Sequence, residues 1–205
     1  MNTIDKYLSV KGLSKAIYRD RGSRFLAFAM PVNSAADAKN FIDQYKKEYH
    51  DAKHHCYAYV IGPSGNITKQ SDDGEPSGTA GRPLLGQINA RNLTNTLVVV
   101  VRYFGGTLLG TGGLINAYKT SASEALDNAE IIECYRLAHL RIRFPYSGTN
   151  DVMRILNSVN ADIEKQEFAE ECFIQAGIRF TESEKILNRL RESGDIRVDI
   201  QPDEW

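Results

Sequence analysis

The residues best suited to chemistry lie between Asp72 and Leu114, which hold more than half of the chain's 16 glycines. Glycine lets the backbone adopt positive φ angles or approach a ligand closely. The cluster from Gly105 to Gly113 separates an apolar run from a helical pattern. Free N–H groups at a helix start attract phosphate, so this cluster predicts an anion site. A closely packed strand-to-helix turn is the alternative, because the cluster contains neither a GxxxxGK[ST] nor a GxGxxG motif.

Basic and aromatic residues could extend this site into a surface for RNA. Arginines would contact phosphates, while Tyr103, Phe104 and Tyr118 could stack on bases. Arg19 and Arg21 add positive charge in an expected hairpin turn. A solvated surface of mixed charge is the alternative interpretation. The candidate ligands for phosphate or RNA are Arg24, Arg82, Arg102, Gly105, Gly106, Gly110, Thr111, Gly112 and Gly113.

A second group of residues would shape the groove. The acidic loop Asp72-Asp73-Gly74-Glu75 could hold a hard cation, or its carboxylates could cap the next helix by accepting backbone N–H bonds. On a strand, His54 and Cys56 share one face and could form a mixed metal site or a thiolate–base pair. A sheet histidine beside a buried, inert thiol is the alternative. The groove-shaping candidates are His54, Cys56, Asp72, Asp73, Glu75 and Thr79.

Composition limits the classes of function. The chain has 205 residues and a formal net charge of −1, so any site for nucleic acid has to be local. Three widely spaced cysteines indicate reduced thiols, and no run approaches the about 18 apolar residues of a membrane span. A cytoplasmic protein without membrane contact is expected. Because no Ser-His-Asp order, HExxH motif or nucleophile elbow occurs, the patterns favour a protein that is not an enzyme and needs no cofactor or metal.

The elements that position these residues follow from the spacing of apolar residues. The strand expected at 95–104 has a continuous apolar centre, which indicates burial on both faces. Ser34 is a suitable N-cap for the first helix. The expected order is strands at 7–18 and 24–32, a helix after Ser34, strands at 54–61 and 66–70, a helix at about 79–91, the strand at 95–104, and a helix at about 114–128.

The remainder of the chain follows a different pattern. Its order is β-α-β-β-α-β over about 70 residues, which is typical of the split-βαβ, ferredoxin-like fold. The sequence therefore predicts two domains, 1–132 and 133–205. The expected elements of the second are a strand at 135–144, a helix at 149–159, strands at 162–168 and 171–180, a helix at 181–193 and a strand at 195–200.

Four segments of the chain resemble the Impact/YigZ family. Two of them are highly specific and match without gaps: Asp72–Gly81 (DDGEPSGTAG) and Val101–Gly110 (VRYFGGTLLG). Ser23-Arg24-Phe25 and the run His54–Tyr59 (HHCYAY) add to the match. The resemblance covers residues 1 to about 130 as the Impact domain, and the remainder is similar to the smaller C-terminal domain of the bacterial members.

The resemblance implies an α+β fold. The first domain would have the fold of ribosomal protein S5 domain 2, and the second would be ferredoxin-like, similar to the last domain of elongation factor G. Both comparisons point to translation and RNA. Eukaryotic Impact restrains a stress kinase of translation initiation by competing for that kinase's activator, through an N-terminal module that this sequence does not contain. Kinase regulation is therefore not expected here, and the resemblance transfers no catalytic residue.

Residues and resemblance together predict a translation-linked regulatory protein, or one that binds RNA or the ribosome, with a glycine-rich groove for anions. Its partners would be RNA, the ribosome or other translation-related proteins. One alternative is an enzyme acting on a phosphorylated small molecule, since S5-like folds also occur in small-molecule kinases. Another is a module for protein–protein interaction. The leading prediction requires the two glycine-dense segments to lie next to each other in the fold.

Overall fold

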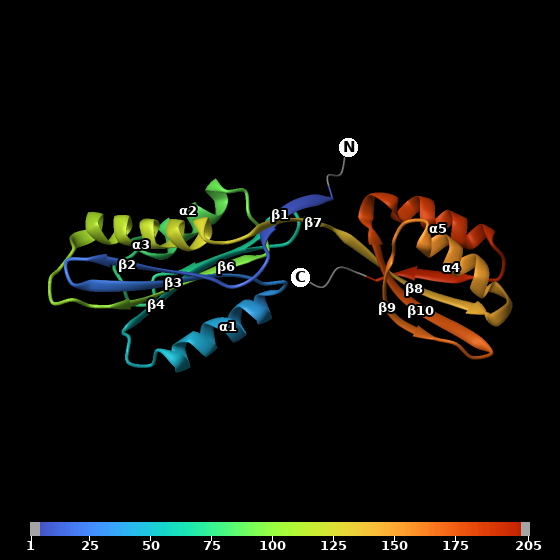
Figure 1. Ribbon diagram of the computed structural model, residues 1–205, viewed down its shortest axis with the longest axis horizontal. Coiled ribbons are helices and arrows are strands. Elements are labelled where there is room, and N and C mark those ends of the chain that lie inside the picture. Colours follow the sequence, from blue (N-terminus) through green and yellow to red (C-terminus); the bar gives the residue numbers. More distant parts are fainter. Residues whose placement is uncertain (1–4, 202–205) are drawn as a thin grey trace. The chain divides into compact units, whose positions relative to one another are not determined.

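The computed structural model describes residues 5–201, which form two compact units (Figure 1). The first unit holds Tyr7–Cys134, and the second holds residues 135–201 together with Asp5 and Lys6. Each unit has hydrophobic core clusters of its own. Within residues 5–201, no helix is long and apolar enough to cross a membrane. The fold is of the α+β class.

In the first unit, five antiparallel strands form a sheet in the order β2-β3-β6-β4-β5. Helices α2 and α3 pack on one face of this sheet, and α1 packs on the other (Figure 1). Strands β1 and β7 form a separate two-stranded sheet. The bounds are β1 Lys6–Val10, β2 Ser14–Asp20, β3 Ser23–Pro31, α1 Ala35–Glu48, β4 His54–Ile61, β5 Ile67–Ser71, α2 Gly81–Ala90, β6 Thr96–Tyr103, α3 Gly110–Asp127 and β7 Ile131–Tyr135.

Strand β6 is the centre of the sheet and is buried on both faces. Val98 and Val100 belong to the core under α2 and α3, whereas Val99 and Val101 belong to the core under α1. All four side chains are fully buried, as the continuous apolar run predicts. The prediction for this strand is confirmed, and it places Arg102 at the end of the strand on the face of α2 and α3.

Two of the expected boundaries in this unit are wrong. The expected strand at 7–18 is two strands, because β1 pairs with β7 while β2 pairs with β3, and the chain leaves one sheet for the other at 11–13. Helix α3 begins at Gly110, inside the glycine cluster, rather than near Leu114. Leu109 and Leu114 are both buried at this first turn. Their packing outweighs the low helix propensity of glycine, which local pattern alone cannot reveal.

The second unit has the strand order of the split-βαβ fold. Its four strands lie in the order β11-β8-β10-β9, and every neighbouring pair is antiparallel. Short 3-10 turns precede both helices. Helix α4 starts at Thr149, as expected, whereas α5 starts at Ser183, two residues later than expected, because η2 ends at Glu182. The bounds are β8 Leu137–Pro145, η1 Tyr146–Gly148, α4 Thr149–Asn157, β9 Asp162–Glu167, β10 Glu171–Arg179, η2 Phe180–Glu182, α5 Ser183–Glu192 and β11 Arg197–Ile200.

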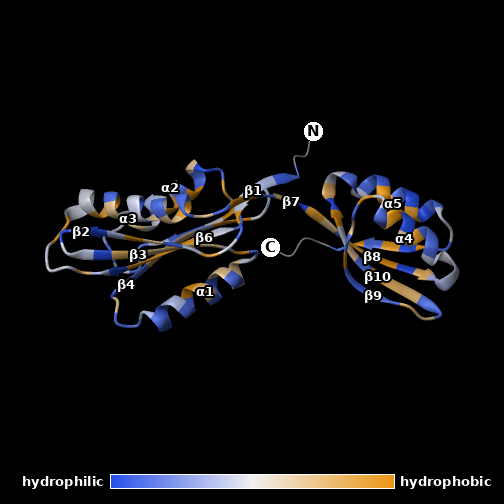
Figure 2. Ribbon diagram, in the orientation of Figure 1, coloured by the Kyte–Doolittle hydropathy of each residue, from blue (hydrophilic) through white to orange (hydrophobic). Residues whose placement is uncertain are grey.

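Helices α4 and α5 pack against one face of this second sheet (Figure 1). In β8, the buried residues Ala138, Leu140, Ile142 and Phe144 alternate with more exposed ones. Figure 2 shows this alternation as bands of hydrophobic and hydrophilic colour along the strands of the unit. In the described part of the unit, no helix lies against the opposite face of the sheet.

Candidate functional site

The β2–β3 turn and the glycine cluster meet backbone to backbone. A Cβ atom at Gly105 would overlap the backbone of Gly22 and Ser23. The Gly105 N–H also donates a 3.1 Å hydrogen bond to the Ser23 hydroxyl. Gly22 adopts a φ of 80°, a conformation that residues with a side chain rarely take. We call residues 20–23 and 104–113 together the loop end of the first unit.

The loop end lies largely at the surface. Phe104 and Leu108 are 54% and 82% exposed, whereas Leu109 between them and the helix is buried and anchors the segment. The first turn of α3 has backbone N–H groups without partners inside the helix. Of the predicted anion ligands, Gly105, Gly106, Gly110, Thr111 and Gly112 are exposed, and Gly113 is half-buried.

The carboxylate of Asp72 organises the acidic loop from within. It accepts hydrogen bonds from the backbone N–H groups of Gly78, Ala80 and Gly81, at 2.8, 2.9 and 2.8 Å. Burial acts to raise the pKa of Asp72, but these three donors outweigh it and hold the pKa below its usual value. The geometry is that of the helix-capping alternative, because the carboxylate closes the loop in front of α2.

Asp73 joins the same loop to two other elements. Its carboxylate accepts a 2.9 Å hydrogen bond from the ammonium of Lys46 on α1 and a 2.7 Å hydrogen bond from the backbone N–H of His55. Burial acts to raise the pKa of Asp73, but these donors lower it overall. The carboxylates of Asp72 and Asp73 thus both accept hydrogen bonds from groups of the protein itself. Among residues 5–201, no group of three or more His, Cys, Asp or Glu side chains is arranged to hold a metal ion.

Glu75 connects the two glycine-dense segments through a buried network. Its carboxylate accepts from the Arg102 guanidinium and from the Tyr118 hydroxyl, each at 2.7 Å. The side chains of Arg102 and Glu75 are only 7% and 3% exposed. The guanidinium also lies 5.7 Å from the ring centroid of Phe104. The segments therefore do lie next to each other, but the charge of Arg102, a predicted phosphate ligand, is already paired inside the protein.

Arg102 still has a buried donor without a partner. Its Nε atom is buried and has no hydrogen-bond partner. A buried donor without a partner costs about 1–3 kcal/mol. The contacts of the guanidinium with the rings of Phe25 and Phe104 recover part of that cost.

The side chains of His54 and Cys56 also contact the backbone of the acidic loop. The Cys56 thiol donates to the backbone carbonyl of Asp72 at 3.0 Å, and its sulfur lies 3.3 Å from the Tyr118 hydroxyl. Burial raises the pKa of Cys56 well above that of a free thiol. A ring nitrogen of His54, Nδ1, lies 2.9 Å from the Asp73 carbonyl oxygen. The geometry matches the inert-thiol alternative, because a reactive cysteine needs a lowered pKa.

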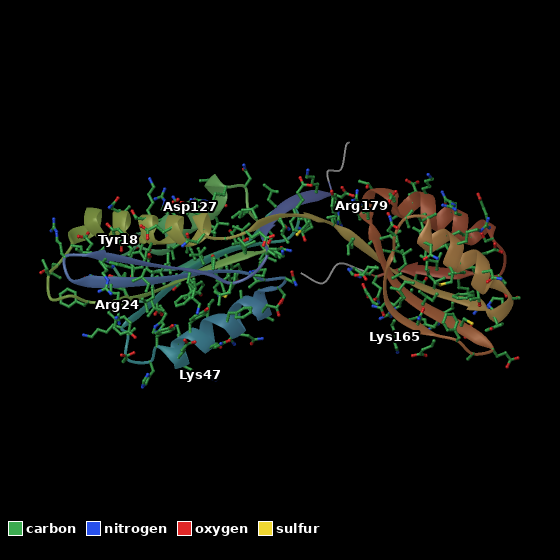
Figure 3. All side chains as sticks on the ribbon, viewed as in Figure 1. Tyr18, Arg24, Lys47, Asp127, Lys165 and Arg179 are labelled. Atoms are coloured by element: carbon green, nitrogen blue, oxygen red, sulfur yellow. The ribbon has the colours of Figure 1, made fainter. Side chains whose placement is uncertain are left out.

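The remaining predicted ligands are not gathered at one point. Arg24 and Arg102 lie on opposite faces of the sheet, since Arg24 stacks over Tyr103 at 4.7 Å on the α1 side (Figure 3). Arg82 is exposed in the first turn of α2. Thr79 is buried, and its hydroxyl donates to the Pro76 carbonyl at 2.6 Å. A single phosphate therefore cannot contact Arg24 and Arg102 together.

The expectation that Tyr118 could stack on a base is wrong, because the residue is buried, and sequence reasoning missed the Gly22–Gly105 contact. Tyr118 is fully buried on α3, where it links Cys56 to Glu75. A large aromatic residue between the small Ala117 and Ala122 was the available signal. The glycine contact had a weaker signal, since it joins two segments 83 positions apart and depends on the pairing of β3 with β6.

Comparisons with known proteins agree with the resemblance. The family model "Impact N-terminal domain" matches residues 21–126, which contain the whole loop end except residue 20. IMPACT family member YvyE of Bacillus subtilis is 41% identical over 147 residues, covering 71% of this chain and 68% of YvyE. An IMPACT family member of Haemophilus influenzae is 34% identical over 181 residues, covering 87% of this chain and 88% of the relative.

A solved structure also matches nearly the whole chain. The crystal structure of a hypothetical protein aligns with a TM-score of 0.75 at 27% sequence identity. The alignment covers 98% of this chain and 100% of the other. Both units therefore have counterparts in one solved protein chain.

Proposed function

Because the chain belongs to the Impact family, we propose that it is a translation-linked regulatory protein of the cytoplasm that binds RNA through the loop end of its first unit. The observation that carries this proposal is the Gly22–Gly105 contact. It joins the turn that contains Arg21 to the exposed start of α3. A cationic side chain and a glycine-rich helix start are then available to one polyanion.

The loop end has the chemistry that RNA binding needs. Arg21 of the loop end and Arg19 next to it on β2 are exposed and can pair with phosphates. The N–H groups of the first turn of α3, together with the helix dipole, favour negative charge. The exposed ring of Phe104 offers a stacking surface for a base. Arg102 supports the site without contacting RNA, because its ion pair with Glu75 fixes the strand end from which the glycine cluster starts.

The family supports the link to translation. The resemblance to this family implies a role in translation, and the match to the Impact N-terminal domain includes nearly all of the loop end. The three cysteines, all free thiols, suit a reducing compartment. RNA or the ribosome is the proposed partner.

Thr111→Glu is the sharpest test, because it separates binding from folding. Thr111 is exposed in the first turn of α3, where a carboxylate interacts favourably with the helix dipole and stabilises the helix by about 0.3–1 kcal/mol. The same carboxylate repels phosphate. We expect at least about tenfold weaker binding of single-stranded RNA at low salt, and a shallower dependence of binding on salt. The measurement is fluorescence anisotropy between about 50 and 200 mM salt.

Asn40→Glu is the matched control. Asn40 is exposed on α1, on the other face of the sheet, and the substitution changes the net charge by the same amount. Binding equal to that of the wild type is expected for this variant. If the two variants weaken RNA binding equally, the effect is one of overall charge and the loop end is not the site. A pulldown from nuclease-treated extract gives a different outcome if protein is the partner. If the wild type then captures a translation-related protein and Thr111→Glu does not, the loop end binds protein.

A further inference from the structure

The helix-free face of the second sheet carries an unusual set of side chains. Because residues alternate along each strand, every second position of β8 and β10 points away from the core. We call this surface the open face. Its strands contribute His139, Arg141, Arg143, Lys165, Phe173, Gln175 and Arg197, together with the carboxylates of Glu164, Glu167, Glu171 and Asp199.

Two arginines of the open face lie directly opposite each other. Arg143 on β8 is the cross-strand partner of Arg197 on β11. Both side chains are exposed, and within the described residues neither forms an ion pair or a hydrogen bond. Like charges directly opposite on neighbouring strands destabilise a sheet. An anionic ligand that bridges the two guanidinium groups would remove this repulsion.

Two carboxylates of the open face are engaged by other side chains of the same face. Glu164 contacts His139 and accepts a 2.8 Å hydrogen bond from Gln175, and Glu167 pairs with Lys165 at 2.7 Å. Asp199 is the cross-strand neighbour of Arg141. On the β8–β11 half of the face, Arg143 and Arg197 thus have no ion-pair partner within the described residues.

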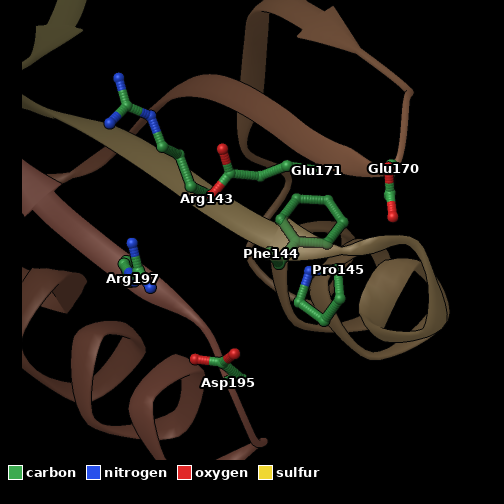
Figure 4. A pocket seen from close by; sticks show the side chains of 7 residues that line it. All are labelled: Arg143, Phe144, Pro145, Glu170, Glu171, Asp195 and Arg197. Carbon is green, nitrogen blue, oxygen red and sulfur yellow. The ribbon is translucent and has the colours of Figure 1, made fainter.

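A shallow cavity of about 170 Å³ lies beside the pair (Figure 4). Figure 4 shows Arg143 and Arg197 on neighbouring strands, with Glu170, Glu171 and Asp195 around the same hollow. These three carboxylates would repel a small free anion held inside the cavity. The arginines are better suited to the phosphates of a chain that passes over the sheet.

An aromatic ring continues the row of arginines. Phe173 on β10 is the cross-strand partner of Arg143, so Arg197, Arg143 and Phe173 form one row across three strands. The ring is half-buried, and the Lys165 ammonium lies 5.9 Å from its centroid. An open sheet that offers a ring beside cationic side chains can stack an unpaired base while it pairs with the flanking phosphates.

We propose that the open face of the second unit binds single-stranded RNA, with Arg143 and Arg197 on consecutive phosphates and a base stacked on Phe173. The proposal concerns a surface separate from the loop end and stands or falls independently of it. The two unpaired arginines favour a polyanion as the ligand. The half-buried ring of Phe173 favours a polyanion with flat bases, such as RNA, over an acidic polypeptide.

The test compares the full chain with its Arg143→Gln/Arg197→Gln variant. The probe is a labelled uridine oligonucleotide of about 12 nucleotides. We expect about tenfold weaker binding, and a slope of log affinity against log salt that falls by about 1.4, because about 0.7 is lost for each phosphate contact to a single strand. The variant should be at least as stable as the wild type, since a like-charge pair is removed. Loss of binding is then not a consequence of unfolding.

Two further variants make the result specific. Lys185→Gln/Arg191→Gln makes the same charge change at exposed positions of α5, on the helical side of the unit, and should bind as the wild type does. Phe173→Leu keeps an apolar side chain but removes the ring, and should weaken binding at least fivefold.

Three results would overturn the proposal. One is wild-type affinity in the Arg143→Gln/Arg197→Gln variant, and another is an equal loss in the α5 control. The third is polyglutamate competing as well as RNA does, which would assign the face to an acidic polypeptide. If Thr111→Glu weakens binding while the open-face variants do not, the loop end is the RNA site and this inference alone fails. The reverse outcome would remove the proposed role of the loop end and leave the open face.

Discussion

At the scale of single residues, the polar groups of the acidic loop act within the folded protein. The sequence left two interpretations of Asp72-Asp73-Gly74-Glu75 open, and the geometry favours capping because three backbone N–H groups converge on Asp72. Arg102 was predicted to contact phosphate, yet it pairs with Glu75, 27 positions away. Local pattern reveals which residues carry charge. It does not reveal which charge finds a partner, since that depends on contacts between distant segments.

Asp72→Asn should lower the free energy of unfolding by about 1–2 kcal/mol at pH 7. The value lies at the low end for hydrogen bonds to a charged group, because water partly screens this half-buried carboxylate. The pKa of Asp72 is lower in the folded state than its ordinary value of 3.8. Its contribution is therefore fully present above about pH 4 and is lost as the pH falls through the folded-state pKa.

Urea unfolding of wild type and Asp72→Asn at pH 7 and at pH 3 measures this directly. The difference between the two proteins should shrink at the lower pH. Asp43→Asn is the control, because Asp43 is exposed on α1 and its side chain forms no hydrogen bond or ion pair with the described residues. A difference that is the same at both pH values would contradict a role for the charged carboxylate.

At the scale of elements, the types and order of the elements were predictable, but some boundaries were not. Strong local signals gave the strand His54–Ile61 and the helix capped by Ser34, whose hydroxyl accepts from the Asp37 N–H at 3.1 Å. The break at 11–13 and the start of α3 at Gly110 depend instead on which strands pair and which leucines become buried. Glycines in the cluster therefore have different functions, although they look alike in the sequence.

Gly105→Ala and Gly112→Ala should differ sharply. A methyl group at Gly105 overlaps the backbone of the β2–β3 turn, so the strand ends must separate, and we expect a loss of more than about 2 kcal/mol in stability. At Gly112 a methyl group meets open space in the first turn of α3. Alanine is a better helix former than glycine by up to about 1 kcal/mol, so this variant should be unchanged or more stable.

Thermal unfolding distinguishes the two outcomes. Equal melting temperatures for the two variants would mean that the turn and the cluster do not pack as tightly as the Gly22–Gly105 contact requires.

At the scale of the whole molecule, a change in periodicity separated the two units in the sequence. The second unit has the expected β-α-β-β-α-β order, and its strands pair in the order that this pattern specifies. The pairing of β1 with β7 was not predictable, because it joins strands more than 100 residues apart that carry no complementary local signal. Long-range pairing is the part of a fold that local pattern specifies least.

Separate cores predict separate unfolding. Leu140 is fully buried in the core of the second unit, and Val100 is fully buried in that of the first. Leu140→Ala should cost about 2–5 kcal/mol through lost burial and the cavity left behind. Because the two residues lie in different core clusters, we expect the loss to stay within the unit that carries the substitution.

Hydrogen exchange followed by mass spectrometry resolves the two units. In Leu140→Ala, amides of β8 and β10 should exchange faster, while those of β3 and β6 keep the protection of the wild type. Val100→Ala should produce the reverse pattern, so each variant is the control for the other. Faster exchange in all four strands of either variant would instead mean that the two units unfold as one cooperative structure, since only global opening exposes both cores at once.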